Sequence, residues 1–479
     1  MDTFTYRAHL GSVLLFSLLL VAGCSKELPA PNVVFIYIDD LGWRDVGFMG
    51  STYYETPHLD RLASQGMVFT NAYANAPNCA PSRASLLTGL YTPRHGIYTV
   101  GTPERGEAHL RKLIPVANTT ALDTSFVTFA EVLEGAGFAT AHMGKWHLGG
   151  DGHLPTDQGF GLNVAGDHRG APPAHFYPYE RRGNALPDLH NGAKGEYLTD
   201  RLTDEAMRFI ETHADESFFL YLAHYAVHTP IQAREVLVET FRQKPGDEAH
   251  NDPVYAAMIA SVDEGVGRIM DQLDALGLAE NTVVFFHSDN GGYGPATSMQ
   301  PLRGSKGMLY EGGIRVPLAV RWPGRIEAGS SSDTPVIGTD IYPTLLEMAD
   351  VVSPPGLELD GASLMPLLTG TASLEPRNLF WHFPAYLEAY RGTTEPWRTT
   401  PGGAVRQGDY KLVEFFEDGT LELYNLRGDI GEEVNLADEM PEKVQELRAD
   451  LRAWREAVRA TVPTEKNPAY VDSANATSR

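Results

Sequence analysis

The sequence predicts an α/β/α sandwich with a mostly parallel sheet, followed by a smaller antiparallel sheet packed with a helix. Three uncharged apolar runs end abruptly in polar residues, at 33–38, 218–222 and 282–286. Such runs are typical of strands buried on both faces. Helix-like stretches fall between and after them, at 125–135, 255–276 and 339–348. This alternation indicates a sheet covered by helices on both sides.

The C-terminal part has a different pattern after about residue 370. Short β-rich runs separated by turn signals predict antiparallel strands at 378–383, 403–406, 411–416 and 420–424. The Asp418-Gly419 pair predicts a hairpin between the last two. A helix is expected from Pro441, with one apolar face formed by Val444, Leu447, Leu451, Trp454 and Val458. We therefore expect a large domain at 31–370, an α+β subdomain at 371–462 and a loose tail at 463–479.

The N-terminal segment is expected to be an export signal. Residues 10–22 are uncharged and Leu-rich, shorter than the ~20 residues of a membrane span and typical of a signal peptide. They lead into Val21-Ala22-Gly23-Cys24, which resembles a bacterial lipobox. This predicts a lipoprotein signal peptide at 1–23, lipidation of Cys24, and a tether at 24–30; an ordinary signal peptide with an incidental cysteine is the alternative. The mature protein would be an anchored lipoprotein, facing the periplasm or on the cell surface.

Charge and cysteine content narrow the function. The chain has 62 acidic against 38 basic residues, a net charge of −24, which argues against nucleic acid as a partner. An anionic substrate would need a local cationic pocket, because the protein as a whole repels it. The chain has two cysteines, so lipidation of Cys24 would leave Cys79 without a disulfide partner.

Cys79 lies in the segment 78–83 (NCAPSR), which reads as a loop entering a helix. In the first turn of a helix, the dipole and the nearby Arg83 would lower the pKa of the thiol. The sequence therefore predicts an activated cysteine; a buried structural cysteine is the alternative.

Acidic and amide side chains follow two of the predicted strands. Asp39 and Asp40 end one run, and Asp289 and Asn290 follow another. The carboxyl ends of parallel strands are where ligands collect in such folds. A set of oxygen ligands favours Ca²⁺ or Mg²⁺ over Zn²⁺. Taken alone, a pair of aspartates is more often a turn or a helix cap.

The motif Cys79-x-Pro81-x-Arg83 resembles the signature of type I, formylglycine-dependent sulfatases of the alkaline-phosphatase-like superfamily. The similarity extends from about residue 31 to the last helix. It implies that a formylglycine-generating enzyme or maturase oxidises Cys79 to formylglycine (3-oxoalanine), whose hydrated form attacks sulfur. It also implies one Ca²⁺ ion, bound by the formylglycine and by Asp39, Asp40, Asp289 and Asn290.

The same resemblance assigns further roles. Lys145 and His147 would contact the sulfate and the formylglycine, with His147 as the base that releases sulfate. His228 would protonate or stabilise the leaving oxygen, and Lys306 would bind sulfate. Together with Arg83 and the Ca²⁺, these cations would stabilise charge in a pocket shielded from water. Four other residues are expected to be structural: His142, His224, Arg303 and Arg315.

The substrate is indicated less directly. The polar loop 166–173 is followed by aromatic residues, and Asp167, His168 and Arg169 are its candidate sugar contacts; a plain surface loop is the alternative. The pattern is similar to bacterial carbohydrate sulfatases and to animal N-acetylgalactosamine sulfatases. This implies a sulfated polysaccharide or its oligosaccharides, with galactose-type units favoured. A formylglycine-dependent phosphonate or phosphodiester hydrolase and a non-catalytic glycan-binding lipoprotein are alternative functions.

Overall fold

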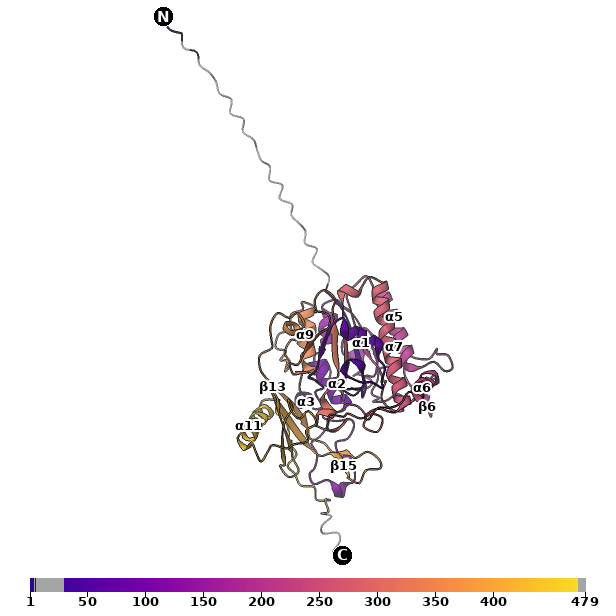
Figure 1. Ribbon diagram of the computed structural model, residues 1–479, viewed down its shortest axis with the longest axis vertical. Helices are drawn as coiled ribbons and strands as arrows, with labels where there is room; N and C mark the ends of the chain where they lie inside the picture. Colours follow the sequence, from indigo (N-terminus) through magenta and orange to yellow (C-terminus); the bar gives the residue numbers. More distant parts are fainter. Residues whose placement is uncertain (4, 6–29, 473–479) are drawn as a thin grey trace.

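The protein is described by a computed structural model that covers residues 1–3, 5 and 30–472 (Figure 1). Cys24, with nearly all of the predicted signal peptide and tether, lies outside these residues. Within them, no helix combines the length and the apolar character that a membrane crossing requires.

The large sheet has eight strands in the order β11-β2-β10-β9-β1-β8-β4-β5. Their bounds are β1 Asn32–Ile38, β2 Met67–Phe69, β4 Ala139–Gly144, β5 Leu162–Val164, β8 Phe218–Ala223, β9 Thr282–Ser288, β10 Leu318–Arg321 and β11 Ser330–Ser332. Strands β9, β1, β8, β4 and β5 are parallel, whereas β10 runs antiparallel to β9 and β2. The sheet is therefore mostly parallel, and the carboxyl ends of β1, β4, β8 and β9 meet at one edge.

Alternate side chains of β1 enter two different cores. Val34, Ile36 and Ile38 pack with α1 (Pro57–Ser64), α5 (Leu198–Thr212), α6 (Glu235–Arg242) and α7 (Pro253–Ala275). Val33, Phe35 and Tyr37 pack with α2 (Cys79–Thr88), α4 (Phe129–Gly135), α9 (Ile341–Met348) and α10 (Met365–Leu368). Figure 1 shows α5 and α7 on one side of the sheet and α9 on the other. The predicted three-layer sandwich is confirmed.

Two predicted helices begin later in the structure than in the sequence analysis. The helix expected from residue 125 starts at Phe129, because Thr128 Oγ1 accepts the N–H of Glu131 while the Glu131 carboxylate accepts the N–H of Thr128. This reciprocal capping box fixes the first turn. The helix expected from residue 339 starts at Ile341, after a 3₁₀ turn over Gly338–Asp340.

The C-terminal sheet is antiparallel, in the order β13-β16-β17-β18. Its strands are β13 Asn378–Phe383, β16 Gly402–Gln407, β17 Tyr410–Phe415 and β18 Leu421–Asn425. Helix α11 (Pro441–Ala457) packs on it through a shared apolar core, formed by Val405, Leu412, Leu423, Val444, Leu447 and Leu451. The predicted smaller sheet with its helix is thus confirmed, and Figure 1 places both beside the large sandwich.

The two sheets are joined by buried charges. Lys411 Nζ in β17 lies 2.9 Å from Glu311 Oε1 in α8 (Glu311–Ile314) and 2.8 Å from Glu432 Oε1. All three side chains are buried, so losing one partner would leave an uncompensated charge. The remaining α-helix and strands are short: α3 Thr92–His95, β3 Ala72–Tyr73, β6 Glu180–Arg181, β7 Asn184–Ala185, β12 Val336–Ile337, β14 Leu387–Glu388 and β15 Trp397–Thr399.

The segment expected to be a loose tail is attached to the protein as far as it is described. The N–H of Ile114 donates to the carbonyl of Glu465 at 2.9 Å, and that of Asn467 donates to Lys112 at 3.0 Å. Residues 465–471 therefore pair with residues 109–114, which corrects the expectation of a tail beginning at 463.

Candidate active site

The polar residues that follow β1 and β9 interlock at the carboxyl edge of the sheet. Asp40 has a left-handed backbone, with φ of 62°, and its N–H donates to Asp289 Oδ1 at 3.1 Å. The amide Nδ2 of Asn290 donates to Asp40 Oδ1 at 2.9 Å. A non-glycine residue in this conformation is costly and needs such surrounding contacts. The two strand ends are thereby held as one rigid unit.

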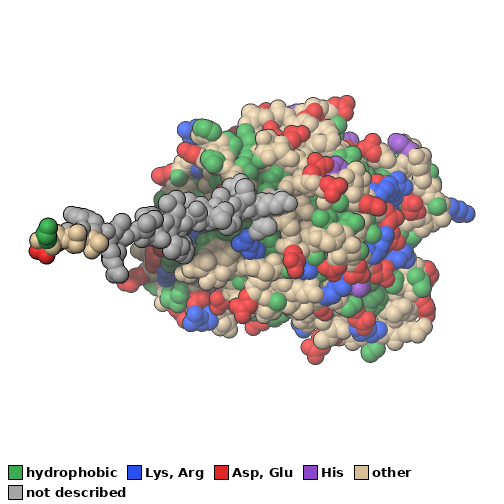
Figure 2. Space-filling view, turned by 90° about the horizontal axis from the view of Figure 1, so that it is seen from above, with side chains coloured by type: hydrophobic (Ala, Val, Ile, Leu, Met, Phe, Trp, Pro, Cys, Tyr) green, Lys and Arg blue, Asp and Glu red, His purple; other side chains and the backbone are tan. Residues whose placement is uncertain are grey.

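Each of the three carboxylates in this unit pairs with one cation. The N–O distances are 2.7 Å for Lys145–Asp39, 2.6 Å for Lys306–Asp40 and 2.8 Å for Arg83–Asp289. Burial raises the pKa of Asp39, against Lys145. Burial acts in the same direction on Asp40, but Lys306 and His228 hold its pKa well below the usual range. The buried pairs differ from the outer face of the protein seen in Figure 2, where acidic and basic side chains are interspersed at the surface.

Cys79 is the first residue of α2 and is buried beside these carboxylates. Its Sγ and one oxygen each of Asp39 and Asp289 lie within 4.8 Å of one another. Burial raises the pKa of the thiol, and Asp39 and Asp289 add to this effect, against Lys145 and Lys306. Arg83 pairs with Asp289 instead of the thiol. The prediction that the pKa of the thiol is lowered is therefore wrong. Cys79 is a buried thiol whose raised pKa keeps it protonated at neutral pH.

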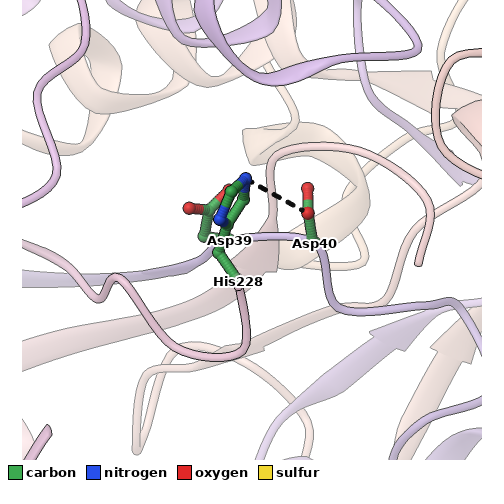
Figure 3. A group of neighbouring side chains, drawn as sticks. All are labelled: Asp39, Asp40 and His228. Carbon is green, nitrogen blue, oxygen red and sulfur yellow. Dashed lines mark ion pairs between the residues drawn. The ribbon is translucent and has the colours of Figure 1, made fainter. Parts of the chain in front are cut away.

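His228 belongs to the loop after β8 and faces Asp40 (Figure 3). Its Nε2 lies 3.6 Å from Asp40 Oδ2, while Nδ1 lies 2.9 Å from the carbonyl of Thr229. A carbonyl only accepts, so this geometry assigns the ring proton to Nδ1. Burial and Lys306 lower the pKa of His228 to about 3.

His147 follows β4 and also has a left-handed backbone, with φ of 64°. Its N–H donates to the carbonyl of Asp167 at 2.9 Å. Burial, with Lys145 and Arg83, lowers the pKa of the imidazole well below its ordinary value. The ring is therefore neutral at neutral pH and can accept a proton.

The residues at the sheet edge fit a divalent cation. Asp39 Oδ1 and Asn290 Oδ1 are buried and have no hydrogen-bond partner. Buried polar atoms without a partner are rare and require an explanation. Asp39 offers a ligand atom to two candidate groups, one with Asp40 and His228 and one with Cys79 and Asp289. Carboxylate and amide oxygens in this number suit a hard ion such as Ca²⁺.

A cavity of about 410 Å³ opens above this set. Its walls include five of the predicted residues, namely Asp40, Cys79, His147, His228 and Lys306. Arg83, Lys145, Asp39, Asp289 and Asn290 lie behind them, at the carboxyl edge of the sheet. The wall also contains Asn78, the neighbour of Cys79, and residues that the sequence analysis missed: Val100, Arg105, Tyr293, Leu387 and Arg398. No motif marks them, since only the fold brings these segments to the cavity.

The predicted sugar contacts lie next to this wall. Gly170 and Ala171 line the cavity, but Asp167, His168 and Arg169 do not. Arg169 pairs with Asp167 at 2.6 Å, and His168 is exposed. Asp167 contacts the site through its backbone carbonyl, which accepts the N–H of His147.

The four residues expected to be structural are held in structural contacts. Arg315 pairs with Glu311 at 2.7 Å, and Arg303 donates to the hydroxyl of Tyr424 at 2.7 Å. Buried His142 lies 3.1 Å from Asn163 Oδ1, and buried His224 uses its backbone N–H to bond the carbonyl of Tyr37.

The chain is similar to known proteins of one family. The sequence model of the sulfatase family matches residues 31–351, about two thirds of the chain. The chain belongs to the sulfatase family. A second model, described as the C-terminal part of N-sulphoglucosamine sulphohydrolase, matches residues 305–460 of this sulfatase.

Relatives of this sulfatase cover most of its length. A sulfatase of Formosa agariphila is 34% identical over 516 residues, covering 92% of each chain. The N-acetylgalactosamine-6-sulfatase of Mus musculus is 34% identical over 419 residues, covering 82% of this chain and 73% of that protein. The crystal structure of Ps i-CgsB in complex with k-i-k-neocarrahexaose has a TM-score of 0.74 and 27% identity, covering 94% of this chain and 96% of that one. The protein is thus an enzyme of the expected family and fold.

Proposed function

We propose that this sulfatase hydrolyses sulfate esters of a carbohydrate, either a sulfated polysaccharide or its oligosaccharides. The single observation that carries this proposal is the position of Cys79, which shares a cavity with Lys306, His147 and His228 and lies beside Asp39 and Asp289. The relatives support the substrate class, since one is an N-acetylgalactosamine-6-sulfatase and another was solved with a neocarrahexaose. The first of these favours galactose-type units.

The metal and the modified residue belong to this proposal. Ca²⁺ would be held by Asp39, Asp40, Asp289, Asn290 and the oxidised residue 79. When bound, the ion would polarise sulfate oxygens, and formylglycine, made from Cys79 by a formylglycine-generating enzyme or maturase, would supply the nucleophilic oxygen. Binding of the sulfate and transfer of protons would be carried out by other side chains of the protein.

The cations of the site would orient and neutralise the sulfate. Lys306 lines the cavity, with Lys145 and Arg83 directly behind the carboxylates that they pair with. In a buried pocket, fixed positive groups stabilise developing negative charge more strongly than water does. Since the carboxylates already balance these three cations, an added divalent ion would make the site positive. An anionic ester would then offset that charge.

The two histidines are the candidates for proton transfer. In the net reaction the bond between sulfur and the ester oxygen breaks, and that oxygen leaves with the electron pair. His228 keeps its Nδ1 proton on the carbonyl of Thr229, so its Nε2 would first take up a proton from solvent. It would then deliver that proton to this oxygen, which releases the alcohol. His147 is neutral and would accept the proton lost as water restores the nucleophile and sulfate departs.

The test compares substrates and the state of residue 79 in one preparation. Mass spectrometry of the peptide containing Cys79 should show the aldehyde, and aryl sulfate should be turned over faster than phosphate monoesters or diesters. The variant Cys79→Ala should lose turnover. Phosphodiester hydrolysis that exceeds sulfatase activity by a wide margin would instead support the phosphonate or phosphodiester hydrolase. Binding of a glycan without any turnover by the oxidised protein would contradict the proposal.

We also propose that the chain is exported and anchored through lipidated Cys24, facing the periplasm or on the cell surface. The lipobox-like segment supports this. Labelled fatty acid should enter the wild-type protein and not a Cys24→Ser variant. We further propose residues 31–370 and 371–462 as the catalytic domain and the C-terminal subdomain, because the chain passes from one sheet to the other between them.

A further inference from the structure

We propose that the substrate carries a second anionic group and that Arg105 and Arg398 bind it. This inference rests on the proposed function and deepens it. The substrate would be a carbohydrate with one sulfate ester at the reacting position and another sulfate or a carboxylate nearby.

Arg105 and Arg398 line the same cavity as Cys79 and His147, although they come from distant parts of the chain. Arg105 belongs to a loop after α3, and Arg398 belongs to β15 in the C-terminal part. Both are partly buried. Two guanidinium groups thus converge on the substrate cavity in addition to Lys306.

The loop and β15 are fixed against each other. Gly106 has φ of 69°, and a Cβ at this position would lie 2.5 Å from the ring of Trp397. The N–H of Gly106 donates to Glu388 Oε1 at 2.9 Å, and Glu388 pairs with Trp397 across β14 and β15. Arg105 directly precedes Gly106, and Arg398 directly follows Trp397. Their convergence is therefore built into the backbone.

The charge of the two arginines is not neutralised. Although the chain has 62 acidic residues, no ion pair found among the described residues involves either one. Arg398 donates to the carbonyl of Lys306 and to the hydroxyl of Tyr390, both at 3.1 Å, and its guanidinium lies 4.0 Å from the Tyr390 ring centre. These neutral partners fix the direction of the guanidinium and leave its charge available. Arg105 similarly donates to the carbonyl of Val100.

Arg83, Lys145 and Lys306 differ in this respect, because each is paired with a carboxylate of the reacting centre. The second pair of cations is therefore surplus to a single sulfate. A cavity of about 410 Å³ falls within the usual size of small-molecule sites, ~300–1,000 Å³. Guanidinium groups bind sulfate and carboxylate alike, so either group satisfies the geometry.

The experiment measures kcat/KM for three matched disaccharides: one with a single sulfate, one with a second sulfate, and one with a single sulfate beside a uronate. The wild type should prefer one or both dianionic substrates. Arg105→Gln and Arg398→Gln should each reduce that preference about ten- to a hundredfold, the usual effect of losing a hydrogen bond to a charged group. Most of the change should appear in KM, because the contact is to a group that does not react.

Arg325→Gln is the matched control, because Arg325 is exposed and follows antiparallel strand β10, at the opposite edge of the sheet. It should leave all three values unchanged. Equal preference of the wild type for the three disaccharides, or equal losses on all three in the arginine variants, would overturn the inference. A preparation that cleaves no sulfate ester, including an aryl sulfate, would instead show that the proposed function has failed.

Discussion

Arg83 donates from Nε to Asp289 Oδ2 at 2.9 Å, and its Nη2 lies 2.8 Å from the same oxygen as an ion pair. The third nitrogen, Nη1, donates to the carbonyl of Lys145 at 2.8 Å. A single guanidinium therefore links α2 to the residues that follow β9 and β4. Since Asp289 Oδ1 accepts the N–H of Asp40, the link also reaches the end of β1.

Replacing Arg83 by Met should lower the free energy of unfolding by about 3–5 kcal/mol, because it leaves the Asp289 carboxylate buried and unpaired. Urea denaturation would measure this. Arg325→Gln, which changes an exposed arginine, should stay within ~0.5 kcal/mol of the wild type. A loss below about 1 kcal/mol for the Met variant would show that the pair does not hold these elements together.

Gly170→Ala should reduce kcat at least tenfold, because a Cβ at residue 170 would lie 2.4 Å from His147 Cε1 and 2.5 Å from Nε2. The ring would have to move, and small displacements of a reacting group are costly. Steady-state kinetics would measure the effect. Gly428→Ala is the matched control, since no atom lies within 4 Å of its added Cβ. An unchanged kcat in Gly170→Ala would show that the reaction does not depend on the position of the His147 ring.

Removing Ca²⁺ should lower the melting temperature, because a ligand that binds only the folded state stabilises it, by ~2.7 kcal/mol at a hundred times its Kd. Thermal melting with chelator and then with added Ca²⁺ would measure this without any turnover. Asn290→Ala should shrink the Ca²⁺-dependent shift, because Asn290 Oδ1 is one of the buried atoms without a partner. An equal shift in both proteins would place the ion elsewhere.

Asp263 should make stability fall as pH rises from about 4 to 6. Its carboxylate accepts the N–H groups of Leu59 and His58 at 2.7 and 3.2 Å. Burial nevertheless raises its pKa to about 6. A pKa that is higher in the folded than in the unfolded state gives stability below the unfolded value, near 4, and loses it as pH rises through the folded value.

Asp263→Asn removes this titration. Relative to the variant, the wild type should lose about 2–3 kcal/mol between pH 4 and pH 6, measured by urea denaturation at each pH. Parallel pH profiles of the two proteins would show that Asp263 titrates normally.

The sequence was sufficient for the parts of the molecule that local patterns determine. Uncharged runs predicted β1, β8 and β9, and their polar endings predicted that Asp39, Asp40, Asp289 and Asn290 would meet. Parallel strands bring such ends together whatever lies between them. The spacing of the apolar residues likewise predicted the apolar face of α11.

Other features depended on the surroundings of a residue. The pKa of Cys79 could not be predicted, because burial and the aspartates outweigh the helix end and the nearby lysines. Arg105 and Arg398 carry no motif, and they line one cavity because their two segments lie against each other at Gly106 and Trp397. The pairing of residues 465–471 with 109–114 is likewise invisible in the sequence, since backbone bonds place no demand on side chains.

The cavity wall draws on two separate parts of the gene, and the later part contributes only to the proposed substrate selection. Residues 39–306 carry the proposed reacting groups and also Arg105, whereas Leu387 and Arg398 come from a later segment that lines the same cavity. Exchange of that later segment between related genes would therefore give enzymes that act on different glycans while the sulfur chemistry is inherited intact.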